Sequence, residues 1–252
     1  MRRIQRKHTI RPAAALALVL VLILGIGAAE PLRLAPDLAG TVEIPLTDAG
    51  AKYIYTYAYP QVETEDASAE LINTFYQYMA RDAEDFEIPM NADYYRGQNP
   101  ETDVRVDIGY EVTCNSDAYF SVLLHTAQGE LHTAAGHTFS RTGLKAGSSV
   151  ALPYLLGLLE NGETDSWLQD RQTAKADETV RRIVWERLQE MDGLEPWEDL
   201  GEESLEYGFF PEEDFYLDET GNPVFYLQPG FAEDSGRLLR FPISVEEILD
   251  EM

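Results

Sequence analysis

Alternating apolar and polar residues predict β-strands in several parts of this chain. The clearest strand runs from Val104 to Cys114, where every second residue is apolar. Residues 41–59 alternate in the main as well, and they predict two strands joined by a turn at Asp48-Ala49-Gly50. We expect Pro60 to end the second of these strands.

Further strands are predicted downstream. A turn at Asn115-Ser116-Asp117 connects Val104–Cys114 to a strand at residues 118–124, and another strand follows at residues 131–140. A hairpin is predicted near the end of the chain, where the apolar runs 215–217 and 224–227 flank a segment rich in turn-forming residues. The first half of the chain therefore reads as a helix plus an antiparallel meander.

Helical spacing marks four other segments. Leu71, Phe75, Met79, Ala83 and Phe86 recur every three or four residues, which predicts a helix over residues 67–86 with Asp66 or Ser68 as its cap. A short helix is expected at residues 152–159 and a long one at 174–191, with Val180, Val184, Leu188 and Met191 on its apolar face. Ser244 and Glu247 form a capping box for a terminal helix.

These elements predict an α+β fold, with antiparallel sheets and packed helices in two closely associated subdomains, preceded by one N-terminal apolar helix. We expect a spacer at residues 30–40, an N-terminal subdomain at 41–140 and a C-terminal subdomain at 141–252.

Residues 1–29 form a basic and apolar leader. Five lysine or arginine residues precede an uncharged apolar run at 13–29, which is the pattern of an export signal. Gly27-Ala28-Ala29 offers the small residues that signal peptidase recognises, whereas the leucine and valine content favours a retained single-pass membrane anchor. We favour the anchor, with cleavage and secretion as the alternative. The chain from Glu30 onward is expected to be extracytoplasmic.

The exported part is strongly acidic. The whole chain has a formal net charge of −26, and leaving out the five basic residues of the leader, which has no acid, lowers it to −31. Such a body repels nucleic acid and anionic membranes, so membrane contact is expected through the leader alone, and it attracts cationic partners. Cys114 is the only cysteine. It falls on the apolar side of its strand, which indicates a small buried residue more than a reactive thiol.

The residues suited to catalysis or metal binding form no recognised pattern. His125, His132 and His137 lie on neighbouring predicted strands and could approach one another, but their spacing differs from known zinc motifs, and strand-surface histidines are the simpler interpretation. Nucleophile elbows, phosphate loops and dinucleotide fingerprints are all missing from the sequence. We therefore predict no catalytic, cofactor-binding or metal-ligating residues.

One acidic stretch stands apart as a candidate interface. Residues 195–219 contain eleven Asp or Glu and no Lys or Arg, and aromatic residues are interleaved with the acids. Such a surface suits a basic protein, because the charges speed association and the aromatic rings supply contact area. The alternative is that the aromatic residues pack in the core and the acids solvate a loop. The candidate partner-binding residues are Trp197, Glu202, Glu203, Tyr207, Phe209, Phe210, Glu212 and Glu213.

Several strings, in this order, resemble a known family of the bacterial envelope. They are Tyr57-Ala58-Tyr59-Pro60, Tyr119-Phe120-Ser121-Val122-Leu123, residues 137–143 with the leucines at 152–156, the hairpin from Phe215 to Pro229, and Gly236 with Phe241-Pro242-Ile243. They resemble the extracytoplasmic domain shared by the lysozyme-sensing anti-sigma factor RsiV and the accessory region of the peptidoglycan deacetylase PdaC. Ser140 and Leu144 depart from that family, which usually has Asp and Lys there.

The resemblance implies an α+β fold, with residues 141–252 as an RsiV-like subdomain, no catalytic residues, and a binding role at the cell envelope. The RsiV partner is lysozyme, a basic protein. An anti-sigma factor needs a longer cytoplasmic segment than the twelve residues before the apolar run, so we expect the sensor domain without its regulator.

We therefore expect a non-enzymatic extracytoplasmic binding or sensor domain for lysozyme or another cationic protein. The alternative is an accessory domain or enzyme that acts on cell-wall glycan.

Overall fold

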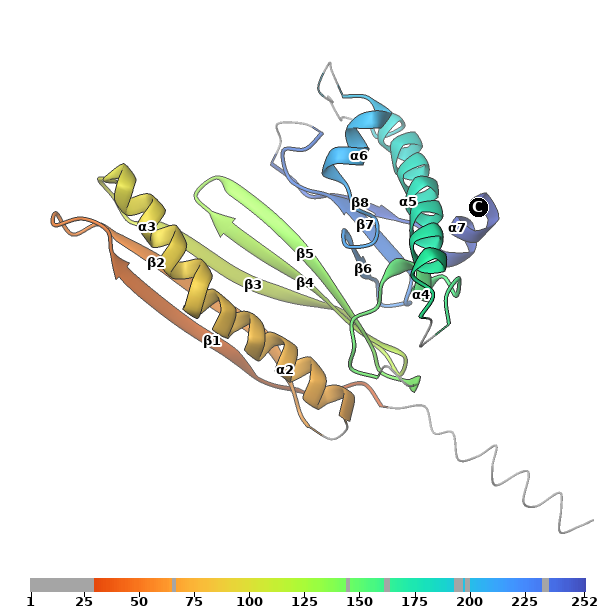
Figure 1. The fold of residues 1–252 in the computed structure, drawn as a ribbon, viewed down its shortest axis with the longest axis horizontal. Coiled ribbons are helices and arrows are strands. Elements are labelled where there is room, and N and C mark those ends of the chain that lie inside the picture. Colours follow the sequence, from red (N-terminus) through yellow and green to blue (C-terminus); the bar gives the residue numbers. More distant parts are fainter. Residues whose placement is uncertain are drawn as a thin grey trace, which may run out of the picture. The chain divides into compact units, whose positions relative to one another are not determined.

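A five-stranded sheet forms the first part of the described chain (Figure 1). The computed structural model describes residues 30–64, 67–143, 146–160, 164–192, 197, 200–232 and 236–252. The sheet has the strand order β1-β2-β3-β4-β5. Its strands are β1 (Leu34–Pro45), β2 (Lys52–Val62), β3 (Val104–Asn115), β4 (Tyr119–Gln128) and β5 (Leu131–Ser140). The strands predicted at 104–114, 118–124 and 131–140 are thus confirmed.

Two expectations about the first strands are wrong. β1 begins at Leu34, inside the predicted spacer, and its first residues pair with the end of β2, as in Leu34 with Val62. Pro60 does not end β2. It lies beyond Tyr57, the last β2 residue that pairs with β3, so its missing N–H costs no hydrogen bond to that strand.

β2 and β3 pair in parallel, whereas the other neighbours in the sheet are antiparallel. The sequence predicted antiparallel sheets alone. The difference arises because a helical crossover carries the chain back to the end of the sheet where β2 began. This crossover consists of α2 (Ala67–Asp82), the π-helix η1 (Ala83–Glu87) and α3 (Ile88–Gln98).

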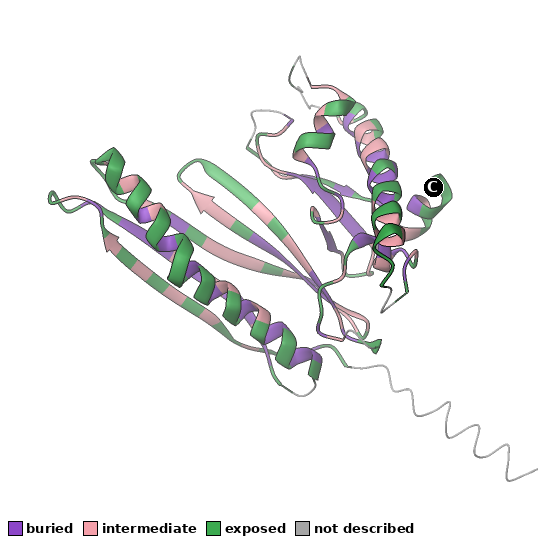
Figure 2. Ribbon diagram, viewed as in Figure 1, coloured by how far each residue is buried: buried purple, intermediate pink, exposed green. Residues whose placement is uncertain are grey.

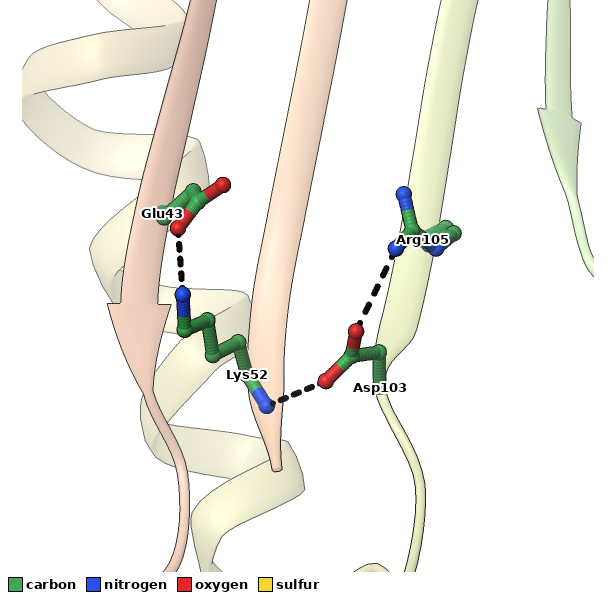
Figure 3. Close-up of polar contacts among 4 residues, drawn as sticks. All are labelled: Glu43, Lys52, Asp103 and Arg105. Atoms are coloured by element: carbon green, nitrogen blue, oxygen red, sulfur yellow. Dashed lines mark hydrogen bonds and ion pairs between the residues drawn. The ribbon is translucent and has the colours of Figure 1, made fainter. Parts of the chain in front are cut away.

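Polar contacts join the ends of β1, β2 and β3 where the parallel pair begins (Figure 3). The Lys52 ammonium donates to Glu43 Oε2 at 2.7 Å, and the Lys52 backbone N–H donates to Asp103 Oδ1 at 3.0 Å. Arg105 Nη2 donates to Asp103 Oδ2 at 3.3 Å. These exposed contacts add little stability, but they fit the register in which Tyr53 pairs with Val104.

The buried face of the crossover differs by one position from the predicted face. Ala69, Ile72, Tyr76, Ala80 and Ala83 are buried, and they pack in one core with the tyrosines of β2 and apolar residues of β3, β4 and β5. The alanines allow the helix to approach the sheet closely. Figure 2 shows exposed residues along α2 and α3 and long buried stretches in β2.

The larger apolar residues predicted for that face lie elsewhere. Leu71 is 48% exposed and Phe86 is 69% exposed, while Phe75 and Met79 are partly buried at the edge of the core. The helical segment also continues past Phe86 to Gln98. The wider turn of η1 breaks the spacing of a uniform α-helix at Phe86 and beyond, which accounts for the exposure of Phe86. Leu71, Phe75 and Met79 precede η1, and they lie off the core because Ala69, Ile72, Tyr76 and Ala80 face the sheet instead.

A second core forms around a three-stranded antiparallel sheet, β6 (Phe215–Leu217), β7 (Pro223–Leu227) and β8 (Leu239–Pro242). The long helix α5 (Ser166–Gln189) contributes Val180, Val184 and Leu188 to this core, as predicted. Two short helices, α4 (Leu152–Leu155) and α7 (Val245–Glu251), also belong to this part. The hairpin of β6 and β7 is confirmed, whereas β8 was not predicted.

Side-chain caps begin two of these helices. The Asp165 carboxylate accepts from the Trp167 and Leu168 N–H groups at the start of α5. Ser244 accepts from the Glu247 N–H at 3.1 Å at the start of α7, as its sequence predicted. None of the described helices is both apolar and long enough to cross a bilayer. The predicted leader at 1–29 and the Asp66 cap lie outside the described residues.

Polar contacts join β4 and β5 of the first sheet to β6 and β7 of the second. Ser121 and Thr138 share a hydrogen bond between their hydroxyl groups at 2.9 Å, and the Leu217 N–H donates to Ser121 Oγ at 2.9 Å. The Gly136 N–H donates to the Tyr226 hydroxyl at 2.8 Å. These bonds tie the two sheets together and satisfy backbone groups that would otherwise be costly to bury.

The Gln228 side chain satisfies backbone groups at the outer edge of β5. Gln228 accepts from the Ala134 N–H at 2.9 Å and donates to the Ala134 carbonyl at 2.8 Å. Residues 31–252 form one compact unit. The subdomain boundary at residue 140 remains a prediction.

Gly136→Ala tests the close contact between Gly136 of β5 and the Phe215 backbone of β6. A Cβ at Gly136 would overlap the Phe215 backbone carbonyl, which cannot rotate away. We expect a loss of about 1–3 kcal/mol in the free energy of unfolding, measured by urea denaturation. The matched control is Gly109→Ala on β3, because a Cβ there has no atom within 4 Å. Equal stability of the two variants would contradict the role of Gly136.

Candidate functional site

The predicted acidic stretch forms an exposed surface on the second part of the fold. Two short elements carry it, η3 (Glu202–Ser204) and α6 (Leu205–Gly208). Glu202 and Glu203 are exposed, and so is Glu206. Among the aromatic residues, Tyr207 is 82% exposed, Phe210 44% and Trp197 40%.

Residues 193–196, 198 and 199 lie outside the described residues, so the surface is defined here by Glu202, Glu203, Glu206, Tyr207 and Phe210, and is called the η3–α6 surface. No ion pair joins any of its acids to a base within the described chain. Its carboxylates are therefore open to a cationic partner.

Phe209 does not belong to this surface, which corrects the sequence prediction. Its side chain is fully buried, and its ring meets the ring of Phe225 edge-on, with centroids 6.3 Å apart. The Phe209 carbonyl accepts from Arg181 Nε at 3.2 Å. Phe209 therefore anchors the segment between Tyr207 and Phe210 to the core and cannot touch a partner.

Glu212 pairs with a buried acid that the sequence reasoning missed. Asp177, on α5, is 6% exposed, and Asp177 Oδ1 and Glu212 Oε2 are both buried without a hydrogen-bond partner. Burial first, and then Glu212, raise the pKa of Asp177 to about 8, although Arg181 Nη2 lies 3.7 Å from Asp177 Oδ2 and opposes the shift. Asp177 therefore keeps its proton at neutral pH.

A sequence signal for Asp177 was present. Asp177 precedes Val180 by three residues, which places it on the apolar face that continues through Val184 and Leu188. An acid at a core position of an amphipathic helix indicates a buried carboxyl group.

Asp214 holds the chain between Phe210 and β7. Its Oδ2 accepts from the Phe210 N–H at 2.7 Å, and its carbonyl accepts from the Tyr226 N–H at 3.0 Å. Burial raises the pKa of Asp214 to about 6, and the hydrogen bonds from Phe210 and Gln228 limit the shift. Asp214 is therefore mainly ionised at neutral pH.

A cavity of about 440 Å³ lies between β5 and the segment that carries Glu212 and Asp214. Glu212, Glu213 and Asp214 supply three carboxylates to its wall, and Phe75, Phe139 and Val150 supply apolar surface. Among the described residues of the wall there is no Lys or Arg. Its remaining residues are Ala134, Ala135, Gly136, His137, Thr138, Ser149, Ala151, Phe215 and Tyr226.

The three histidines do not converge. His132 and His137 are five residues apart on β5 and therefore point to opposite faces of the sheet. His137 meets Phe75 of α2 edge-on, with ring centroids 5.0 Å apart, while His125 and His132 are exposed. Burial lowers the pKa of His137 to about 4, so its ring is neutral. Among the described residues, no cluster of His, Cys, Asp or Glu is arranged to hold a metal ion.

Cys114 is 2% exposed and belongs to the second core. Burial raises the pKa of its thiol, which disfavours the reactive thiolate. The prediction of a small buried residue is confirmed.

Comparisons with known proteins identify the fold. No protein-family model matches the sequence, and no curated protein matches it significantly. A solved structure of a DUF3298 family member from Bacteroides fragilis is similar, with a TM-score of 0.52 and 11% identity, over 86% of this chain and 93% of that one. A DUF3298 family protein from Pseudomonas aeruginosa has a TM-score of 0.49 and 12% identity, over 88% and 95% of the two chains.

At this identity, the likeness to the Bacteroides protein shows a shared fold and nothing about a ligand. Neither structure is described as an RsiV or PdaC protein. That finer assignment stays a prediction.

The raised pKa of Asp177, next to Glu212, predicts that the stability of the fold depends on pH. The raised pKa of Asp177 means that the folded protein keeps a proton that the unfolded chain releases, so the free energy of unfolding falls as pH rises from about 4 to about 8. Glu212→Gln removes the neighbouring charge and should flatten this dependence, as measured by urea denaturation across that range. Glu213→Gln, at the adjacent exposed acid, is the control and should keep the wild-type slope. Parallel slopes for wild type and Glu212→Gln would contradict the effect of Glu212 on the pKa of Asp177.

Proposed function

We propose that this chain is a non-enzymatic binding or sensor protein, that it acts outside the cytoplasm at the bacterial cell envelope, and that it binds a basic protein, with lysozyme as the first candidate. The observation that carries the proposal is the η3–α6 surface, where exposed Tyr207 and Phe210 lie among carboxylates that have no basic partner in the described chain.

The chemistry of this surface supports such a partner. Carboxylates attract a cationic protein at long range, and exposed aromatic rings provide contact area that remains effective when salt screens the charges. The formal net charge of −26 for the whole chain acts in the same direction. The basic leader at 1–29 supports the proposed location outside the cytoplasm.

The acid pair supports a binding role more than glycan hydrolysis. The two carboxyl groups of a glycosidase stand roughly 5–9.5 Å apart, on either side of the bond that they cleave. Asp177 is instead only 6% exposed and is not among the described residues that line the cavity, so this pair does not present two carboxyl groups to a sugar there. An accessory role on cell-wall glycan remains the alternative, because the adjacent cavity combines carboxylates with the Phe75 and Tyr226 rings.

Tyr207→Ala tests the proposed surface. We expect the full chain to bind hen-type lysozyme in calorimetric titrations at about 0.15 M salt, where the screening length is roughly 8 Å. Loss of the exposed Tyr207 ring should weaken this binding about tenfold, which corresponds to roughly 1.4 kcal/mol. Tyr94→Ala, at a ring that is 63% exposed on α3, is the matched control and should bind like wild type.

Two outcomes would count against the proposal. Lysozyme binding that disappears at this salt concentration would indicate unspecific charge attraction. An equal loss in Tyr207→Ala and Tyr94→Ala would place the contact elsewhere.

A further inference from the structure

The helical crossover carries large apolar side chains on the side that faces away from the sheet. Leu71 and Tyr78 of α2 are 48% and 68% exposed, Phe86 of η1 is 69% exposed, and Met90 of α3 is 67% exposed. The opposite side of the crossover packs in the first core. Single exposed apolar residues are ordinary on a protein surface, whereas a continuous row of them indicates an interaction site.

The turn of η1 keeps these residues in one row. Tyr78, Asp82, Phe86 and Met90 follow one another at spacings of four residues, and Leu71 lies about two turns before Tyr78. In a uniform α-helix, each step of four residues moves the side chain about 40° around the axis. The wider turn of η1 reduces this drift between Asp82 and Phe86. We call the five residues the crossover stripe.

A hollow of about 570 Å³ lies in the middle of the crossover stripe. Its apolar lining comes from Phe75, Tyr78, Met79 and Phe86, and the carboxylate residue Asp82 lines it as well. A hollow with apolar walls can take up an apolar side chain of a partner, which is how an amphipathic helix is anchored in a groove.

The charges of the crossover call for a basic partner. Residues 67–98 contain six acidic and two basic residues. Both bases are paired within the crossover, Arg81 with Asp85 at 3.2 Å and Arg96 with Asp93. Asp82 is exposed and forms no ion pair with another described residue. A lysine or arginine placed among the apolar side chains of a partner would therefore complement the crossover stripe.

A second copy of this chain suits the crossover stripe less well. In a symmetric dimer the same surface faces itself. Two antiparallel stripes would bring both Asp82 carboxylates close to the symmetry axis, together with the acidic excess of each crossover. Like charges oppose such a contact, and they also oppose contact with an anionic membrane.

We propose that the crossover stripe binds an amphipathic helix of a partner protein, with apolar side chains of that helix against Tyr78, Phe86 and Met90 and a lysine or arginine against Asp82. This inference goes beyond the proposed function, because the crossover stripe belongs to the first part of the fold and the η3–α6 surface to the second. The two surfaces are separate, and neither requires the other.

A synthetic helix tests the crossover stripe. The probe is a fluorescent amphipathic peptide of leucine and lysine, titrated with the full chain and followed by fluorescence anisotropy at about 0.15 M salt. Phe86→Ala should weaken binding about tenfold, because it removes one wall of the hollow. Asp82→Asn should weaken binding about threefold and make it less sensitive to salt. The same peptide with glutamate in place of lysine should not bind.

Two substitutions on α5 are the matched controls. Trp167→Ala removes a ring that is 65% exposed, and Asp170→Asn removes an exposed carboxylate. Both variants should bind the peptide like wild type, and circular dichroism should show that all four variants are folded. The inference is overturned if wild type does not bind the leucine–lysine peptide, or if Phe86→Ala and Asp82→Asn bind it as tightly as wild type.

Tyr207→Ala separates this inference from the proposed function. It should leave peptide binding unchanged, whatever the result with lysozyme. If Tyr207→Ala weakens peptide binding as much as Phe86→Ala, the peptide binds the η3–α6 surface, and the crossover stripe is overturned as its site while the proposed function stands.

Two further measurements address other occupants. Sedimentation velocity would reveal a dimer of wild type that Phe86→Ala dissociates, and flotation with phosphatidylcholine vesicles would reveal membrane binding that Phe86→Ala abolishes. The first result would assign the crossover stripe to a second copy and the second to a lipid surface, so either would overturn the inference. We expect Phe86→Ala to change neither.

Discussion

The contact between β5 and β6 is the constraint on which the candidate site depends. Gly136 has no side chain, so the Phe215 backbone can lie directly against β5. The Ser121 hydroxyl then bridges Thr138 and the Leu217 N–H in a buried network. Because β6 follows immediately after the segment with Glu212 and Asp214, this contact also sets the distance between those carboxylates and β5. The cavity is a consequence of that spacing.

The acidic residues of the second part of the fold lie in two different environments. The acids of the η3–α6 surface are exposed to water, where they cost little and act at long range. Asp177 and Glu212 are held where water cannot solvate both of their charges, which raises the pKa of Asp177. A buried acid pair with one guanidinium neighbour is poor structural support, and such groups concentrate where proteins bind ligands.

Phe209 connects the exposed Tyr207 and Phe210 to the buried Asp177. Its ring is fixed in the second core, and its carbonyl is held by Arg181, the residue that also faces Asp177. Tyr207 and Phe210, on either side of this anchor, are exposed to solvent.

Much of the local structure followed from the sequence alone. The alternation at Val104–Cys114 and the cap at Ser244 depend on neighbouring residues, and both appeared as predicted. The parallel pairing of β2 with β3, the burial of Phe209 and the contact between Asp177 and Glu212 were decided only by the tertiary structure. The physical reason is range: periodicity and capping are encoded within a few residues, whereas strand pairing, burial and the pKa of a carboxyl group depend on which distant elements pack together.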